Sequence, residues 1–163
     1  MYTTAIVTLS DKGSKGERVD ISGQRIREML PADQYQVVSY TLLPDDRAQI
    51  EAELIRLADE EKVDLILTTG GTGFSPRDVM PEATTAASER LVPGIPEAMR
   101  AYSMQFTKRA MLSRAASGIR KSTLIVNLPG SPKAVRECLE YILPELNHGL
   151  EILLGKTGEC ARK

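Results

Sequence analysis

The residues best suited to catalysis or ligand binding form one short segment, Gly70-Gly71-Thr72-Gly73-Phe74-Ser75-Pro76-Arg77-Asp78. Three glycines in four positions let backbone N–H groups point into one concavity and let a phosphate approach closely. The segment matches neither the Gly-Lys-Ser/Thr loop nor the G-x-G-x-x-G pattern of common nucleotide sites. A tight structural turn would also explain the glycines, but packing alone does not require the polar residues Thr72, Ser75, Arg77 and Asp78. We therefore predict a phosphate-binding loop.

Two further acidic residues, Asp45 and Asp46, follow the apolar run that ends at Leu43. One of them is explained as the N-cap of the next helix, which leaves the other without a structural role. If Asp45 and Asp78 meet across adjacent strand ends, the pair could hold Mg2+, which prefers oxygen ligands and shares its shell with substrate phosphates. A helix cap alone is the simpler alternative.

Basic residues dominate the segment from Ala98 to Arg136, which contains eight lysines and arginines and no acidic residue. Such a run is often a solvated face. Arg114 and Arg120, with Ser113 and Asn127 nearby, lie on or beside a predicted hairpin, where they could grip an anion. Carboxylates, a glycine loop and cations together are typical of phosphoryl or nucleotidyl transfer, in which positioning and charge neutralisation do most of the catalysis.

Composition argues against several other classes of protein. The 163 residues include 21 Lys and Arg against 22 Asp and Glu, which disfavours a nucleic-acid binder, and the five Tyr and two Phe offer few platforms for base stacking. The single histidine, His148, is interpreted as a helix-face residue, so acyl transfer has little support. Cys138 and Cys160 fit neither a disulfide framework nor a zinc site and are predicted to be reduced thiols. No apolar run approaches the roughly 18 residues of a membrane span, so we predict a cytoplasmic protein.

The elements that must position these residues alternate between short β-branched runs and longer segments of helical period, a pattern typical of a parallel sheet covered by helices on both faces. Strands are predicted at Thr4–Leu9, Tyr35–Leu43 and Leu65–Thr69, and a hairpin at Ser113–Ile119 and Thr123–Leu128 that adds one antiparallel strand. Helices are predicted over Ile21–Leu30, after Asp46, from about Pro81, from Ala98 to about Lys108, and over Val135–Leu153 with a candidate break at Pro144. The length favours one domain over residues 1–163, a three-layer α/β/α sandwich with a mostly parallel sheet.

The motifs also resemble a known family. The run from Thr69 to Val79, followed by Pro81-Glu82-Ala83-Thr84, is similar to the signature of the MogA/MoaB family of molybdenum cofactor biosynthesis, which includes the G domain of gephyrin. Five further segments resemble the family's other motifs and occur in the same order: Ser10-Asp11, Leu43-Pro44-Asp45, Leu112-Ser113-Arg114, Gly118-Ile119-Arg120 and Asn127-Leu128-Pro129-Gly130-Ser131-Pro132-Lys133. The resemblance covers nearly the whole chain, from Ile6 to about Gly155.

This resemblance implies a molybdopterin-binding fold and a reaction in which the terminal phosphate of molybdopterin attacks the α-phosphate of Mg-ATP, giving adenylyl-molybdopterin and pyrophosphate. It implies that Asp45 and Asp78 are the catalytic acidic pair, which handles Mg2+ and the reacting phosphates. Ser113 would contact molybdopterin, and Asn127 would line the same pocket. Gly70, Gly71, Thr72 and Gly73 would bind the phosphate or nucleotide. The substrate-binding residues would also include Ser75, Pro129 and Gly130, which belong to the matching motifs. Charge alone, and not the resemblance, points to Arg77, Arg114 and Arg120 as phosphate clamps.

The resemblance further implies a homotrimer and a separate downstream protein that inserts molybdenum into the product. No nucleic-acid or membrane partner is expected. One alternative stays open, in which the chain is a non-catalytic, MoaB-like molybdopterin carrier or oligomeric scaffold that keeps the cationic pocket and does not use ATP.

Overall fold

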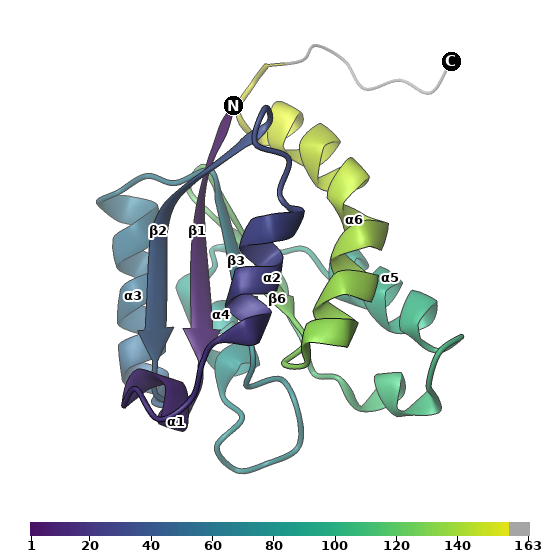
Figure 1. Cartoon of the computed structure of the whole chain (residues 1–163). Coiled ribbons are helices and arrows are strands. Elements are labelled where there is room, and N and C mark those ends of the chain that lie inside the picture. Colours follow the sequence, from purple (N-terminus) through teal and green to yellow (C-terminus); the bar gives the residue numbers. More distant parts are fainter. Residues whose placement is uncertain (157–163) are drawn as a thin grey trace.

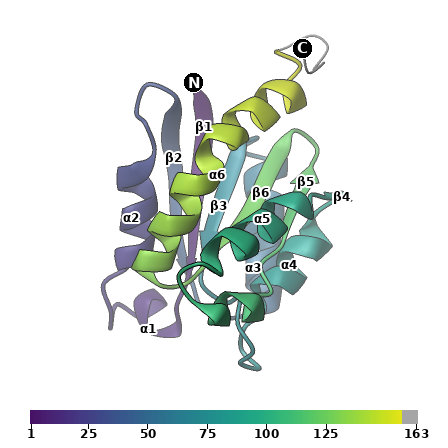
Figure 2. The same cartoon turned by 90° about the vertical axis from the view of Figure 1, so that its right-hand side faces the viewer.

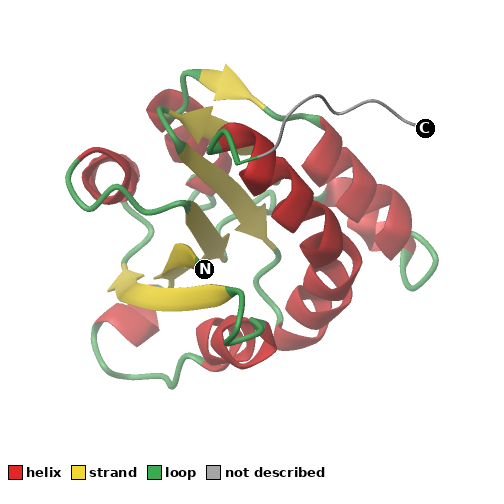
Figure 3. Cartoon of the chain, turned by 90° about the horizontal axis from the view of Figure 1, so that it is seen from above, coloured by secondary structure: helices red, strands yellow, loops and turns green. Residues whose placement is uncertain are grey.

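The computed structural model describes residues 1–156, in which a central sheet is covered by helices on both faces (Figures 1 and 3). Within these residues the sheet has six strands in the order β2-β1-β3-β6-β5-β4. They are β1 (Tyr2–Leu9), β2 (Tyr35–Leu43), β3 (Leu65–Thr69), β4 (Arg90–Leu91), β5 (Ser117–Arg120) and β6 (Thr123–Leu128). Strands β2, β1, β3 and β6 are parallel, whereas β5 is antiparallel to both of its neighbours. The predicted α/β class, with a mostly parallel sheet and an antiparallel strand, is confirmed.

The helices divide between the two faces of the sheet. They are α1 (Asp11–Ser14), α2 (Ile21–Met29), α3 (Arg47–Asp59), α4 (Met80–Ala87), α5 (Gly94–Ser103), the 3-10 helix η1 (Lys108–Leu112) and α6 (Pro132–Leu153). Helices α2, α5 and α6 cover one face, and α3 and α4 cover the other (Figures 1 and 2). No helix in the described part of the chain is long and apolar enough to cross a membrane.

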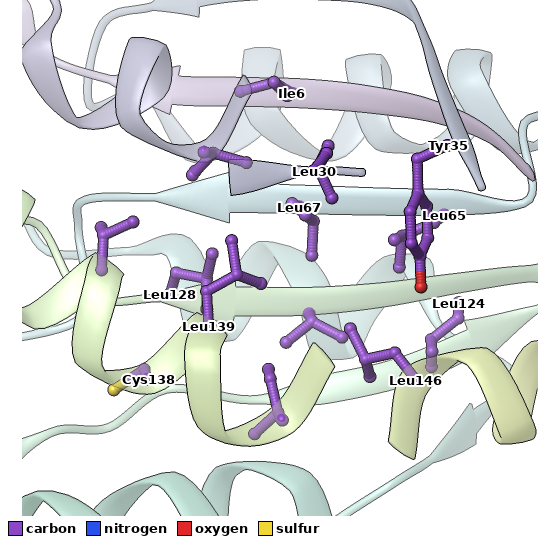
Figure 4. Packing of buried hydrophobic residues seen from close by; sticks show 14 of the residues in the cluster. Ile6, Leu30, Tyr35, Leu65, Leu67, Leu124, Leu128, Cys138, Leu139 and Leu146 are labelled. Carbon is purple, nitrogen blue, oxygen red and sulfur yellow. The ribbon is translucent and has the colours of Figure 1, made fainter. Parts of the chain in front are cut away.

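The core consists of two apolar clusters, one on each face of the sheet. Successive side chains of a strand point to opposite faces, so the fully buried β3 supplies Leu65 and Leu67 to one cluster and Ile66 to the other. On the first face these leucines pack near Leu139 and Leu146 of α6 (Figure 4). Burial on both faces makes the central strands rigid, and the loops at their ends are therefore held in fixed positions.

Polar side chains cap the starts of α2, α3 and α6. The Asp46 carboxylate accepts the Gln49 N–H at 3.0 Å and begins α3. The Asp20 carboxylate accepts the Gly23 N–H at 2.8 Å at the start of α2. The Ser131 hydroxyl accepts the Ala134 N–H at 3.2 Å at the start of α6. Each cap satisfies a backbone donor that has no partner within the helix.

The first strand of the predicted hairpin is shorter than expected, since β5 begins at Ser117 and not at Ser113. The Arg114 N–H donates to Thr72 O at 2.9 Å, and the Ala116 N–H donates to Asn127 Oδ1 at 3.0 Å. These backbone groups are therefore bonded to the glycine loop and to a side chain, and this segment does not form a strand. The residues before β5 belong to the same edge of the sheet as the glycine loop.

One helix has different bounds from those predicted, and the candidate break in another is not found. Helix α5 occupies Gly94–Ser103, and the chain then turns into η1, which Thr107 begins by accepting the Arg109 N–H at 3.3 Å. Helix α6 runs unbroken through Pro144. That proline is exposed, as is Glu140 one turn earlier, so the carbonyl that loses its helical partner lies on the solvent side.

The structure also contains two short elements and places the single histidine and one of the two cysteines. The short α1 and the two-residue β4 were not predicted, because neither is long enough to show a periodicity. His148 lies on the exposed side of α6, 4.0 Å from Glu151. The thiol of Cys138 is buried and free, whereas Cys160 lies outside the described residues.

Candidate functional site

The loops that carry most of the candidate functional residues lie at one edge of the sheet. The parallel strands β2, β1, β3 and β6 end there, at Leu43, Leu9, Thr69 and Leu128. Each is followed by a polar loop, and the loop after β3 projects farthest beyond the edge (Figure 1). In open α/β sheets this edge carries the ligand crevice, so the topology unites residues that are far apart in sequence.

Gly70 and Gly71 are required by the turn that leaves β3. Their φ angles are +94° and +71°, and a Cβ at Gly70 would lie 2.7 Å from the Leu9 carbonyl oxygen. The Met80 N–H donates to Gly71 O at 3.1 Å, which ties the loop to the start of α4. The structural-turn interpretation therefore holds for these two glycines.

Gly73 has a different neighbour, the carboxylate of Asp78. A Cβ at Gly73 would lie 2.8 Å from Asp78 Oδ2. That oxygen accepts the Ser75 N–H at 2.9 Å, and the Asp78 N–H donates to Ser75 O at 2.9 Å. The absence of a side chain at Gly73 thus makes room for one of the two predicted catalytic carboxylates.

Asp11 connects the ends of three strands. Its Oδ1 accepts the Asp45 N–H at 3.0 Å, and its Oδ2 lies 2.7 Å from Arg77 Nη2. The hydrogen bond from Arg77 lowers the pKa of Asp11 below its ordinary value. Sequence reasoning did not list Asp11 as a site residue, although its position directly after the first strand was a usable signal.

Burial raises the pKa of Asp45 above its ordinary value, and the negative charges of Asp11 and Asp78 add to this effect. The positive charge of Arg77 opposes it. Asp11, Asp45, Arg77 and Asp78 therefore share one electrostatic environment, which we call the acidic cluster. Asp46 is the helix cap, as the sequence allowed, and this leaves Asp45 for another role.

The acidic cluster suits a metal that shares its ligands with a substrate. Within residues 1–156, no group of three His, Cys, Asp or Glu side chains is placed to hold a metal ion. Mg2+ usually binds through one or two carboxylates, with substrate phosphates and waters completing its shell. Burial and, to a smaller extent, the charges of Asp11 and Asp78 raise the pKa of Asp45, and a bound cation would favour its ionised form. The carboxylate oxygens of Asp45 and Asp78 are of the kind that Mg2+ prefers, so this donor set fits an ion that shares its shell with a substrate.

Three hollows touch the glycine loop, and the third, of about 450 Å³, is lined by Phe74, Ser75, Pro76, Asp78, Val79, Glu82 and Arg114. The first, of about 290 Å³, is mostly apolar and lies between α5, η1 and the start of α6; we call it the η1 pocket. The second, of about 420 Å³, lies at the ends of β1 and β3 beside the start of α2; we call it the β1–β3 crevice. Thr72, Gly73 and Pro129 line the η1 pocket, while Thr69, Gly70 and Gly130 line the crevice. The glycine loop and the β6–α6 loop thus form the wall between the first two hollows.

The η1 pocket has a rigid polar rim at Ser113. Arg100 Nη1 donates to the carbonyl oxygens of Ser113 at 3.3 Å and of Ala115 at 3.1 Å. These bonds hold the segment before β5 against α5. Sequence reasoning missed Arg100 as a site residue, because its contact is made with backbone atoms that only the fold brings near.

The β1–β3 crevice is lined mainly by hydroxyl and backbone groups. Thr8 Oγ1 is buried here, beside the Tyr40 hydroxyl. Asp20 and Ser22, at the start of α2, also line the crevice. A crevice of this kind offers donors and acceptors to a polar ligand.

Two predicted site residues lie elsewhere. Arg120 ends β5, which runs antiparallel, so it lies at the opposite edge of the sheet and forms hydrogen bonds to Asp59 at 2.9 and 2.8 Å. Asn127 is fully buried and donates to Thr68 Oγ1 at 3.0 Å and Thr84 Oγ1 at 2.8 Å. Neither lines the η1 pocket or the crevice. Asn127 instead connects β6, β3 and α4 behind the site. Asp45, Ser75, Arg77, Asp78 and Arg114 also line neither of these two hollows, but they lie in or beside the glycine loop.

Taken together, the doubly wound sheet, the polar loops at its carboxyl edge and the paired hollows define a ligand-binding α/β protein. Residues 5–148 match the family of molybdenum cofactor biosynthesis proteins described as a probable molybdopterin binding domain. The chain belongs to this family, and the resemblance seen in its motifs is confirmed.

Individual relatives agree with this assignment. The chain is 42% identical over 164 residues to the molybdopterin adenylyltransferase of Helicobacter pylori, with 97% of this chain and 91% of the relative covered. It is 43% identical over 140 residues to the molybdopterin adenylyltransferase of Escherichia coli K12, with coverage of 84% and 71%. The crystal structure of the molybdopterin biosynthesis enzyme MoaB from Thermus thermophilus is similar with a TM-score of 0.90 and 48% identity, covering 98% of this chain and 100% of that one.

Proposed function

We propose that this protein is a molybdopterin adenylyltransferase. An oxygen of the terminal phosphate of molybdopterin attacks the α-phosphorus of ATP, and the bond from that phosphorus to the bridging oxygen of pyrophosphate breaks. The observation that carries the proposal is the shared wall between the η1 pocket and the β1–β3 crevice. Two substrates bound in these hollows would meet at the glycine loop, beside the acidic cluster.

The lining of each hollow favours one substrate. The η1 pocket is mostly apolar with a polar rim at Ser113, which suits the flat ring system of molybdopterin. The β1–β3 crevice lies beside the N-termini of α2 and α6, and such helix ends favour phosphate groups. We therefore assign the nucleotide to the crevice.

The acidic cluster has the parts that adenylyl transfer needs. Asp45 and Asp78 would hold Mg2+, which when bound neutralises charge on the phosphate groups. Arg77 is exposed and pairs with Asp11 at the surface, so its guanidinium can exchange onto a substrate phosphate. Positioning of the two substrates across one wall then supplies most of the catalysis.

The test is pyrophosphate release by the native protein incubated with molybdopterin and Mg-ATP. We expect turnover by the native protein and none by Asp78→Ala, with molybdopterin binding largely retained, because the carboxylate serves the reaction more than the pterin contact. Arg120→Gln, at the opposite edge of the sheet, is the matched control. Binding of molybdopterin without any turnover would contradict the proposal and indicate a carrier.

Three further parts of the proposal concern assembly and location. We propose a homotrimer, a cytoplasmic location, and transfer of the adenylylated product to a separate protein that inserts molybdenum. Light scattering of the purified chain tests the first of these, and a mass of one chain would contradict it.

A further inference from the structure

The guanidinium of Arg114 lies at the base of the loop that carries Asp78. Arg114 Nε donates to Gly73 O at 2.8 Å, and Nη2 donates to Asp78 O at 2.7 Å. These two carbonyls mark the beginning and the end of the projecting part of the loop. One planar group therefore joins both ends of the loop.

A third hydrogen bond joins Arg114 to helix α4. Its Nη1 donates to Glu82 Oε1 at 2.5 Å, and Glu82 belongs to the first turn of that helix. Three of the five N–H donors of the guanidinium are therefore committed to protein atoms.

Arg114 is itself held by the same edge of the sheet. Its backbone N–H donates to Thr72 O at 2.9 Å. The residues on either side are fixed, because Arg100 binds Ser113 O and Ala115 O and the side chain of Asn127 accepts the Ala116 N–H. The anchor of the loop is thus more rigid than the loop, whose residues Phe74 to Arg77 are exposed.

We propose that Arg114 is a positioning residue, which holds the Asp78 carboxylate in place by joining Gly73 O to Asp78 O and does not bind a substrate phosphate. The inference rests on the proposed adenylyl transfer for its effect on the rate. It makes a second claim, about the mobility of the loop, that is independent of any activity.

Two variants separate positioning from charge. Arg114→Gln removes both the positive charge and the planar set of guanidinium donors. Arg114→Lys keeps the charge, but its single ammonium group cannot bond to both carbonyls and to Glu82 at once. Arg56→Gln is the matched control, since the Arg56 side chain has a similar exposed fraction, 38% against 35%, and pairs with Glu53 on α3 and with Glu61 just after it.

The experiment measures hydrogen exchange of the backbone amides of residues 73–79 and the steady-state kinetics of pyrophosphate release by each full-length variant. We expect faster exchange in residues 73–79 in both Arg114 variants and a fall in kcat of about 10²-fold, because a shift of about 1 Å in a reacting group costs this much. The KM values for ATP and molybdopterin should stay near those of the native protein. Arg56→Gln should match the native protein in all of these measurements.

Three results would overturn the inference. Native exchange in residues 73–79 of Arg114→Lys would show that the fork does not hold the loop. Raised KM values with native kcat would show that Arg114 binds substrate, and recovery of native kcat by Arg114→Lys would show that only its charge matters. If Arg114→Gln does not fold, Arg114→Lys decides the question alone. An inactive native protein would refute the proposed function, while the exchange measurement would still decide whether Arg114 holds the loop.

Discussion

Replacing Gly73 by alanine distinguishes a loop built for chemistry from a loop that only turns the chain. A Cβ at Gly73 would lie 2.8 Å from Asp78 Oδ2, whereas ordinary contact begins at 3.4 Å. The carboxylate must therefore move by about 0.6 Å, the difference between these two distances. Because the clashing atom is the end of a side chain, it can move while the backbone stays in place. The movement weakens the hydrogen bond from the Ser75 N–H to this carboxylate. Complete loss of a hydrogen bond to a charged group costs about 1.5 to 3 kcal/mol, so weakening this exposed one should cost about 1 kcal/mol or less.

We expect Gly73→Ala to lower kcat by about 10- to 100-fold, since a misplacement of about 1 Å costs roughly 10²-fold. The free energy of unfolding should fall by no more than about 1 kcal/mol, the cost of weakening this hydrogen bond. Pyrophosphate release at saturating ATP and molybdopterin measures the first quantity, and urea unfolding measures the second.

Gly70→Ala is the matched comparison for stability. Gly70 has a φ of +94°, and its Cβ would lie 2.7 Å from a backbone oxygen, Leu9 O, in the neighbouring strand. A residue held in this region costs about 1 to 3 kcal/mol, and the clash with a central strand adds to that cost. We expect a clearly larger loss of stability than in Gly73→Ala. A native kcat in Gly73→Ala, or equal destabilisation by the two substitutions, would refute the reasoning.

Three other predictions follow from the same contacts. Asp11→Asn removes a negative charge that raises the pKa of Asp45; ionised Asp45 is lost as the pH falls through that raised pKa, so the acid limb of the kcat/KM profile should move to lower pH. Arg120→Gln should leave kcat unchanged and lower the melting temperature. Arg120, with a smaller contribution from Lys121, holds the pKa of Asp59 at about 2, below the ordinary 3.8. The stability from these contacts is therefore present above pH 4 and is lost as the pH falls toward 2, and this pH dependence should be smaller in the variant. Asn127→Leu leaves buried partners at Thr68, Thr84 and Ala116 without their hydrogen bonds and should lower the free energy of unfolding by at least about 2 kcal/mol, measured by urea unfolding. An unshifted acid limb, a changed kcat in Arg120→Gln, or native stability in Asn127→Leu would contradict the respective prediction.

Periodicity was a good guide where burial on a sheet face dictates residue type. The run Leu65–Thr69 is buried on both faces, and its three apolar residues followed by two β-branched threonines make the strand visible in the sequence. The segment Ser113–Ala116 misled the prediction because its residues look like a strand, while its backbone groups bond to Thr72 and Asn127. Such partners are distant in sequence and leave no periodic signal.

The candidate site shows the same division between local and tertiary information. Asp45 and Asp78 could be proposed from the sequence, because strand ends of a parallel sheet meet at one edge. Asp11 was overlooked because a single acidic residue in a polar loop has many ordinary explanations. Its contacts with the Asp45 N–H and with Arg77 depend on three loops meeting in space.

The basic segment shows most clearly what sequence by itself could and could not determine. Composition and motif order determined the fold class, the edge that carries the loops and the residue types available for phosphate chemistry, because these depend on local pattern and chain order. The roles of the individual arginines depend on strand direction and on nearby carbonyls. The antiparallel β5 places Arg120 with Asp59 at the far edge, whereas Arg114 lies beneath the Asp78 loop. Only the tertiary structure could decide this, because a charge has no preferred partner until the fold brings one within hydrogen-bonding distance.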